Sequence, residues 1–318
     1  MRKILVVRND RFGEFLLNVP AFRAIRETYP RAEIHAAVAG GVKELAQAVS
    51  FIDKVIVFPS EGESFIDQAG FVLHVRRERF DAAVVLNPTA RTHWMTFLAG
   101  IPFRAGYARK HHFLLTHTVE DLKGLGQKHE VESNCALVAL LGCYTQDLSL
   151  VLRIPPEVEA GVIRRWGLDP VARYVAVHPW TSDPVKQWPV ENFEKLVSAL
   201  AGGSIRVVII GRPEPWHKEC VVPEGANVID ARGKTSLLEA AAILKHCSVL
   251  VSCDSGPVHL AASVGTPVVA LFRNDMPGKN PQRWGPWPLT GKGHAVIQKP
   301  RLEDITVDEV FMQVGKVF

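Results

Sequence analysis

The stretch VLVSCDSGPVHLAASVGTPVVALF, residues 249–272, decides the fold. Its apolar ends, VLVS and VVALF, predict two buried strands, and the residues between them predict a short helix. Pro257 lies where first helical positions favour proline, Gly265 suits the end of a helix, and Pro267 precedes the second strand. A strand, a helix and a strand in this order predict a parallel sheet with a crossover helix.

The same alternation of strands and helices occurs in both halves of the chain. We expect strands at residues 3–7, 33–38, 54–58, 81–86, 174–178, 206–210, 249–252 and 268–272. We expect helices at residues 42–49, 65–77, 130–141, 190–201 and 236–246. An apolar stripe from Phe15 to Tyr29 predicts an earlier helix, which either begins near Pro20 or kinks there. Residues 104–118 lack this pattern and are expected to form a loop rich in histidine and arginine.

The length of 318 residues fits two domains of similar size. A boundary is expected within residues 153–174, where Pro155-Pro156, Gly167 and Asp169-Pro170 interrupt the pattern. The fold class is therefore α/β, with two Rossmann-like, doubly wound domains at residues 1–155 and 156–318. We expect them to face each other across a cleft, with ligands at the carboxyl ends of the strands.

Composition excludes several classes of protein. Apolar residues make up 47% and charged residues 22%, as in ordinary globular proteins, and the net charge of +4 is too small to indicate nucleic-acid binding. No apolar run approaches the roughly 18 residues of a membrane span, so we expect a cytoplasmic protein. The five cysteines form no CxxC pair, which favours reduced thiols over disulfides or a zinc site.

Two loops carry the candidate chemistry of the second domain. Asp254, Ser255 and Gly256 follow a strand and begin a helix, whose N–H groups suit a diphosphate; the alternative is a plain turn with Ser255 as helix cap. The segment HPWTSDPVKQWP, residues 178–189, also follows a strand and carries hydroxyls and the cation of Lys186. Taken alone, a loop rich in Ser and Thr with one Lys is usually a solvated turn. Both loops leave the same sheet edge, so they can converge on one phosphate-bearing ligand.

These two segments resemble the donor-side signatures of family 9 glycosyltransferases, the ADP-heptose lipopolysaccharide heptosyltransferases. VVRNDRFGEFLLNVPAFRAIRETYP, residues 6–30, resembles their amino-terminal signature. The resemblance runs in order from about residue 3 to about residue 275. It implies the two-domain architecture called GT-B, with an acceptor-binding domain at residues 1–155 and a donor-binding domain at residues 156–318.

The resemblance also implies roles for single residues. Thr181, Ser182 and Lys186 would hold the donor diphosphate, Ser255 and Gly256 would add contacts, and Asp254 would face the sugar. Glu214, in IIGRPEP, would lie near the nucleotide ribose, although the local match is loose. His259 also matches the family, but a histidine on a helix is more often a buried hydrogen-bonding group.

Glu14 is the candidate catalytic base. Inverting transfer needs a group that takes the proton of the acceptor hydroxyl, and a carboxylate suffices. The family pattern usually has Asp at this position, and Glu is longer by roughly 1 to 1.5 Å, an error that can cost about a hundredfold in rate. A shifted backbone could accommodate Glu14, Asp10 could act instead, or the enzyme could be weakened or repurposed. A structural reading is an acidic residue at a helix start.

The predicted function is an inverting, metal-independent and cofactor-free transfer of a heptose or similar sugar. The donor would be an ADP-sugar and the acceptor a lipopolysaccharide core or related glycan, with contact at the inner membrane face if the acceptor is a lipid. The rivals are a nucleotide-sugar epimerase and a non-catalytic nucleotide-sugar binding protein. A basic cluster is either a solvated face or an acceptor-reading loop; its members are Arg104, Arg109, Lys110, His111 and His112.

Overall fold

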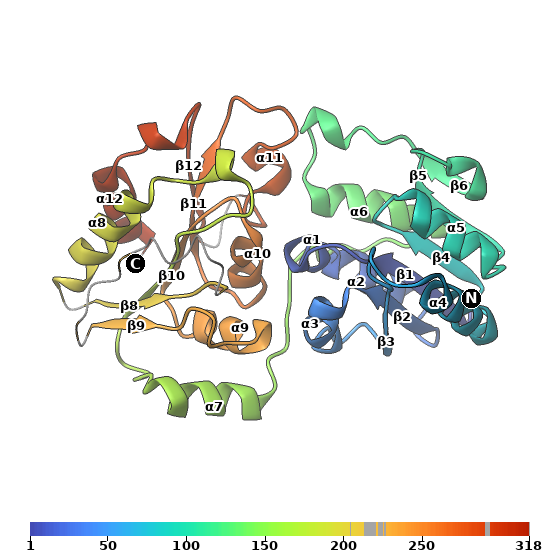
Figure 1. Cartoon of the computed structure of the whole chain (residues 1–318), viewed down its shortest axis with the longest axis horizontal. Coiled ribbons are helices and arrows are strands. Elements are labelled where there is room, and N and C mark those ends of the chain that lie inside the picture. Colours follow the sequence, from blue (N-terminus) through green and yellow to red (C-terminus); the bar gives the residue numbers. More distant parts are fainter. Residues whose placement is uncertain (204, 213–220, 222–224, 226, 290–292, 318) are drawn as a thin grey trace. The chain divides into compact units, whose positions relative to one another are not determined.

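The computed structural model describes residues 1–203, 205–212, 221, 225, 227–289 and 293–317. The chain divides into two compact units. Unit 1 comprises Met1–Gly124 and Lys128–Leu152, and unit 2 comprises Leu125–Gln127 and Arg153–Phe318. The division after Leu152 lies close to the boundary expected after residue 155. Figure 1 shows a sheet with flanking helices in each unit.

Unit 1 contains a six-stranded parallel sheet in the order β3-β2-β1-β4-β5-β6. Its strands are β1 (Lys3–Arg8), β2 (Glu33–Val38), β3 (Lys54–Val57), β4 (Ala82–Val85), β5 (Phe103–Tyr107) and β6 (His117–Val119). Its helices are α1 (Phe12–Leu16), α2 (Val19–Thr28), α3 (Lys43–Gln47), α4 (Phe65–Glu78), α5 (Ala90–Leu98) and α6 (Glu130–Val138).

Unit 2 repeats this topology in the order β12-β11-β10-β7-β8-β9. Its strands are β7 (Tyr174–His178), β8 (Arg206–Ile209), β9 (Val228–Asp230), β10 (Val249–Cys253), β11 (Val268–Arg273) and β12 (Ala295–Lys299). Its helices are α7 (Pro156–Trp166), α8 (Val190–Ala201), α9 (Leu237–Lys245), α10 (Gly256–Ser263), α11 (Pro281–Trp284) and α12 (Val307–Val317). The prediction of two doubly wound α/β domains is confirmed.

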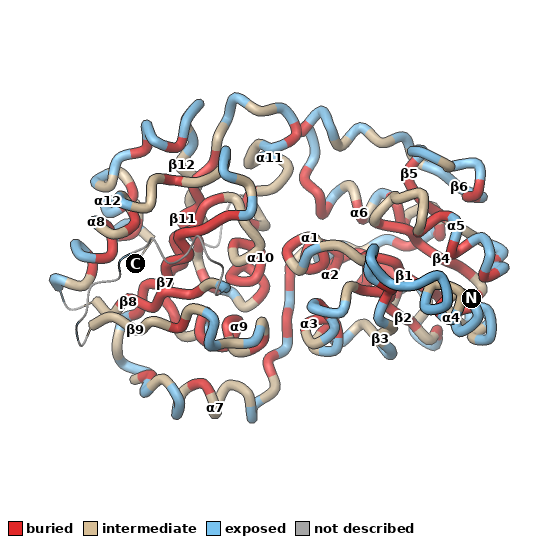
Figure 2. The backbone as a smooth tube through the Cα atoms, viewed as in Figure 1, coloured by how far each residue is buried: buried red, intermediate tan, exposed pale blue. Residues whose placement is uncertain are grey.

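The central strands are apolar because helices cover both faces of each sheet. Every residue of β4, β7 and β10 is buried, and Figure 2 shows these strands as the core of their units. In unit 2, Trp180, Trp188 and Phe193 fill the space beside the sheet and are each at most 1% exposed. Rigid sheets of this kind hold the loops at their carboxyl ends in fixed positions.

Each sheet has one point at which the strand order reverses. In unit 1 it lies between β1 and β4, and in unit 2 it lies between β7 and β10. Ligands of open α/β sheets bind beyond the carboxyl ends of the strands at this point. The loops that the sequence singled out begin at β1, β7 and β10, and so at these two places.

Pro20 occupies the first turn of α2, so the alternative that the regular helix begins near Pro20 is confirmed, and the short helix α1 precedes it. Other local predictions need correction. Residues 104–118 are not simply a loop, because they include most of β5, the 3-10 helix η2 (His112–Leu114) and the start of β6. The strand FRAGY is short and carries an arginine and a glycine, which obscures its apolar pattern. The strands β9 and β12 were also missed, and their residues are only partly buried.

Among the residues that the structure describes, the helices are all too short or too polar to span a bilayer. Cys135, Cys143, Cys247 and Cys253 are free thiols, whereas Cys220 lies outside the described residues. Burial raises the pKa of the Cys253 thiol to about 12, so this side chain is an inert part of the core.

Candidate donor site and candidate base

Lys186 and Asp254 form an ion pair beyond the ends of β7 and β10. Lys186 ends the 3-10 helix η5 (Pro184–Lys186), Asp254 directly follows β10, and 2.5 Å separates Lys186 Nζ from Asp254 Oδ2. The two side chains are only 19% and 10% exposed. Burial raises the pKa of Asp254, and the charge of Lys186 opposes this rise. An ammonium group has three N–H donors, so Lys186 can keep its ion pair with Asp254 and still donate hydrogen bonds to phosphate oxygens.

The loop between β7 and α8 is braced from within by Gln187, a residue that the sequence analysis missed. The side-chain amide donates to the carbonyls of Pro179 at 2.6 Å and Trp188 at 2.7 Å, and its oxygen accepts from the N–H of Thr181 at 3.1 Å. These three bonds hold Thr181, which is buried, in a fixed position. Ser182 next to it is exposed. A glutamine in a polar loop gives no sequence signal of this role.

Ser255 occupies the N-cap position of α10, but among the described residues its side chain does not make the capping hydrogen bond that the alternative of a plain capped turn expected. Its hydroxyl instead lies 2.9 Å from Ser252 Oγ and 3.3 Å from His178 Nδ1, and it donates to the carbonyl of Cys253. The buried residues His178 and Ser252, which the sequence analysis also missed, thereby join the ends of β7 and β10. Gly256 follows as the first residue of α10.

Two further predicted residues do not join this constellation. Glu214 lies outside the described residues. His259 is 4% exposed on the second turn of α10, in keeping with a structural role. Unit 2 therefore brings together Lys186, Asp254 and Ser255 at one edge of its sheet, with Thr181 on the braced loop beside them.

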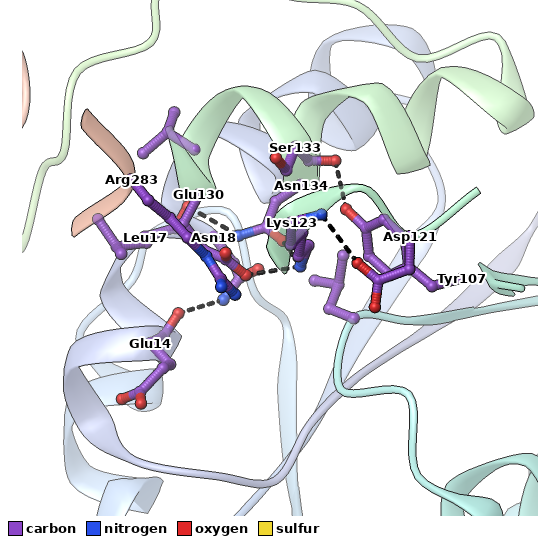
Figure 3. A network of polar contacts seen from close by, with 12 residues as sticks. Glu14, Leu17, Asn18, Tyr107, Asp121, Lys123, Glu130, Ser133, Asn134 and Arg283 are labelled. Carbon is purple, nitrogen blue, oxygen red and sulfur yellow. Dashed lines mark hydrogen bonds and ion pairs between the residues drawn. The ribbon is translucent and has the colours of Figure 1, made fainter. Parts of the chain in front are cut away.

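Glu14 lies in the first turn of α1, at the carboxyl end of β1 in unit 1. It is partly buried, and burial followed by repulsion from Asp10 raises the pKa of its carboxyl group. Asn18 donates to the main-chain carbonyl of Glu14 at 2.5 Å and to that of Phe15 at 3.1 Å. Figure 3 shows the Glu14 carboxylate pointing away from Asn18. The amide of Asn18 therefore fixes the main chain and leaves the carboxylate to act elsewhere.

Asp10, the alternative base, is held by Arg8. The guanidinium Nε of Arg8 donates to Asp10 Oδ1 at 2.7 Å, and Arg8 is 4% exposed. Glu14 forms no ion pair with another described residue. Glu14 therefore combines a raised pKa with the absence of an ion pair to any residue that the structure describes.

A buried polar network, which the sequence analysis did not predict, lies behind α1 (Figure 3). Lys123 donates to Glu130 at 2.6 Å, and Glu130 also lies 3.6 Å from Arg8 Nη1. Lys123 Nζ is 4.1 Å from the centre of the Tyr107 ring, and Asn134 donates to the carbonyl of Leu17 at 3.4 Å. The network joins β1, β5 and α6 to the end of α1, and so fixes the helix that carries Glu14.

The basic cluster borders this network, since Asp121 accepts a hydrogen bond from the main-chain N–H of Lys123 at 3.2 Å. Arg104 donates to the carbonyl of Leu114 at 2.7 Å and covers the ring of Phe97. Arg109 pairs with Asp121 at 3.3 Å.

Comparison with known proteins gives consistent matches. The glycosyltransferase family 9 (heptosyltransferase) profile matches residues 71–302. The chain is 25% identical over 310 residues to lipopolysaccharide heptosyltransferase 2 of Escherichia coli K12, covering 92% of this chain and 87% of that protein. It is 24% identical over 300 residues to lipopolysaccharide heptosyltransferase 3 of the same strain, covering 86% and 82%.

Solved structures show the same fold. The structure of E. coli ADP-heptose lps heptosyltransferase II matches with a TM-score of 0.84 and 22% identity, covering 99% of this chain and 98% of that chain. A glycosyl transferase family 9 structure from Veillonella parvula DSM 2008 matches with a TM-score of 0.84 and 21% identity, covering 99% and 97%. Both matches span units 1 and 2, so the fold class is GT-B. Because the family profile matches most of the chain, this protein belongs to glycosyltransferase family 9 and is a glycosyltransferase.

Proposed function

We propose that this enzyme transfers a heptose from ADP-heptose to a sugar of a lipopolysaccharide core, with inversion at the anomeric carbon. The single observation that carries the proposal is the Lys186–Asp254 pair beside Ser255, at the point in unit 2 where the strand order reverses. Family membership supports sugar transfer and does not favour an epimerase or a non-catalytic binding protein. The curated relatives are lipopolysaccharide heptosyltransferases, which supports the choice of donor and acceptor.

Unit 2 would bind the donor. Lys186, Thr181 and the start of α10 at Gly256 would hold the diphosphate, and Lys186 would stabilise the negative charge that develops as ADP leaves. Asp254 keeps the ammonium of Lys186 in place and would accept hydrogen bonds from hydroxyls of the sugar. Glu214 stays a prediction for the ribose.

Glu14 would act as the base. As the acceptor oxygen forms its bond to the anomeric carbon, the bond from that carbon to the diphosphate oxygen breaks, and the hydroxyl proton passes to Glu14. Asn18 and the network behind α1 hold the main chain at Glu14 in place, which supports a fixed position for a base one methylene longer than the usual Asp. Asp10 is a weaker candidate because Arg8 occupies its carboxylate.

Independence from metal and cofactors belongs to the same proposal. Among the described residues, no group of three or more His, Cys, Asp and Glu side chains could hold a metal ion. Lys186 would supply the positive charge that a divalent cation gives to other glycosyltransferases. A cytoplasmic location, with contact at the inner membrane face, also stays a prediction.

The test measures binding and transfer separately. Titration with ADP-, UDP-, GDP- and dTDP-sugars should show selective binding of the ADP-sugar, and transfer should follow with a truncated lipopolysaccharide. Lys186→Ala should weaken donor binding and lower kcat by about 10² to 10³. Glu14→Gln should lower kcat by about 10² to 10⁴ at near-normal donor binding.

Three variants serve as matched controls. Lys186→Arg keeps the positive charge, Glu14→Asp keeps a carboxylate, and both should retain more activity than Lys186→Ala and Glu14→Gln. Glu27→Gln, an exposed change on α2, should be neutral. If the protein binds no nucleotide sugar, or if Glu14→Gln transfers at the wild-type rate, the proposal is wrong.

A further inference from the structure

Large apolar side chains are exposed on one face of α5 and on η2 in unit 1. Trp94, Phe97 and Leu98 are 41%, 42% and 52% exposed, and Phe113 on η2 is 70% exposed. Residues three and four apart lie on the same side of a helix, so the three residues of α5 form one stripe. The opposite side of α5 is buried. We call Trp94, Phe97, Leu98 and Phe113 the aromatic surface.

The two parts of the aromatic surface are continuous. The ring centres of Trp94 and Phe97 are 6.1 Å apart, those of Trp94 and His111 are 6.2 Å apart, and those of His111 and Phe113 are 5.7 Å apart. His93 Nδ1 lies 3.2 Å from the carbonyl of Lys110, which ties the loop to α5. His111 adopts a left-handed conformation with φ of 61°, unusual for a residue other than glycine. The fold thus holds Phe113 next to α5 at a conformational cost.

The segment that carries the aromatic surface is basic. Residues 82–119 contain no Asp or Glu, and their basic residues are Arg91, Arg104, Arg109 and Lys110 together with four histidines. The guanidinium of Arg104 lies 5.4 Å from the centre of the Phe97 ring. Asp121 neutralises part of the charge of Arg109, whose side chain is still 59% exposed, and Lys110 is exposed. The exposed aromatic rings therefore lie on a basic segment of the chain, which Glu120 and Asp121 follow directly.

We propose that the aromatic surface, with Arg109 and Lys110, docks the enzyme on an anionic lipid bilayer. Aromatic side chains favour the headgroup level of a membrane, and basic residues near it are attracted to anionic lipids. An uncovered apolar patch of this kind is unfavourable in water, which indicates that a partner covers it. The exposed basic side chains of this segment match anionic lipid, whereas a self-contact would bring like charges together. The inference deepens the proposed function, since it identifies the surface that would meet a lipid-linked acceptor.

The experiment is sedimentation with vesicles of phosphatidylcholine alone and of phosphatidylcholine with phosphatidylglycerol. The full-length protein should bind the anionic vesicles, and added salt should weaken the binding. Trp94→Ser/Phe113→Ser should bind at least about tenfold more weakly, because two buried ring contacts with lipid are lost. Arg109→Gln/Lys110→Gln should bind about 25-fold more weakly, at about fivefold for each basic residue.

A matched control lies in unit 2. Phe311 and Met312 on α12 are 42% and 59% exposed, but Asp308 and Glu309 lie on the same helix. Phe311→Ser/Met312→Ser should bind the vesicles as the wild type does. Trp94 is the one tryptophan in the sequence of unit 1, so quenching by brominated lipids should decrease in Trp94→Phe.

Three outcomes would overturn the inference. In the first, the wild type fails to bind anionic vesicles. In the second, Trp94→Ser/Phe113→Ser binds them as well as the wild type does. In the third, the wild type binds no vesicles but forms a dimer in ultracentrifugation, and Trp94→Ser/Phe113→Ser abolishes this dimer. A water-soluble acceptor fragment separates this inference from the proposed function, because Trp94→Ser/Phe113→Ser should still transfer to it. Vesicle binding by a wild type that transfers no sugar would contradict the proposed function alone.

Discussion

Glu14 is a carboxylate whose surroundings disfavour its ionised form. Burial and the neighbouring Asp10 both raise its pKa, and the positive charges of Arg8 and Arg11 only partly offset them. A raised pKa brings a base closer to the operating pH and makes proton transfer more effective. The same shift costs stability, because an ionised Glu14 at neutral pH is better solvated in the unfolded chain.

We expect opposite effects of Glu14 on activity and on stability as pH rises. The acidic limb of kcat/KM for transfer should lie above pH 4.5, the ordinary pKa of this side chain, because the base must be deprotonated. Above pH 4.5, Glu14 holds its proton more tightly in the folded protein than in the unfolded chain. The contribution of Glu14 to stability therefore falls as the pH rises towards the pKa of Glu14 in the folded protein. Glu14→Gln should therefore raise the free energy of unfolding at pH 7 but not at pH 4. Denaturant unfolding at the two pH values checks this, and an equal effect at both would contradict it.

At the scale of elements, α1 is too short to hold its own position. It has five residues, and its N-cap makes no side-chain hydrogen bond with the described residues. The support comes from Asn18 at its end and from the buried network of Arg8, Lys123 and Glu130. Glu130 lies between two cations and is 1% exposed, so it compensates both charges in the interior.

Removal of Glu130 should therefore be costly. Glu130→Ala leaves Lys123 and Arg8 buried without this partner and should lower the free energy of unfolding by about 3 to 5 kcal/mol. Glu132→Gln, two residues along the same helix, changes an exposed carboxylate that accepts the N–H of His129 at 2.8 Å; glutamine can accept the same bond, so the loss should be at most about 1 kcal/mol. Denaturant unfolding measures both. A loss for Glu130→Ala no larger than that of Glu132→Gln would mean that the network contributes little to stability.

At the scale of the whole molecule, two units with the same topology carry different chemistry. Each has its own sheet and its own apolar core. The residues proposed to bind the donor lie in unit 2, and the proposed base lies in unit 1. Ligand binding to one unit stabilises that unit by mass action.

We expect calorimetry to distinguish the units. ADP at a hundredfold excess over its Kd should stabilise unit 2 by about 2.7 kcal/mol and raise its unfolding temperature. Glu130→Ala should lower the unfolding temperature of unit 1 alone. Lys186→Ala should reduce the shift caused by ADP. A single transition that ADP and Glu130→Ala move equally would show that the units unfold together.

The sequence alone determined the fold class, because buried parallel strands appear as apolar runs. It also determined the family, because three signature motifs in the right order are specific to that family. It also identified the loops after β1, β7 and β10, because glycine and proline mark the ends of helices and strands in the local sequence. Only the tertiary structure decided what meets in space. Three contacts join residues that are distant in sequence. They are the ion pair of Lys186 with Asp254, the contact of Ser255 with His178, and the network around Glu130. The short strands β5 and β6 were missed for the same reason, because pairing with neighbouring strands, and not local pattern, stabilises them.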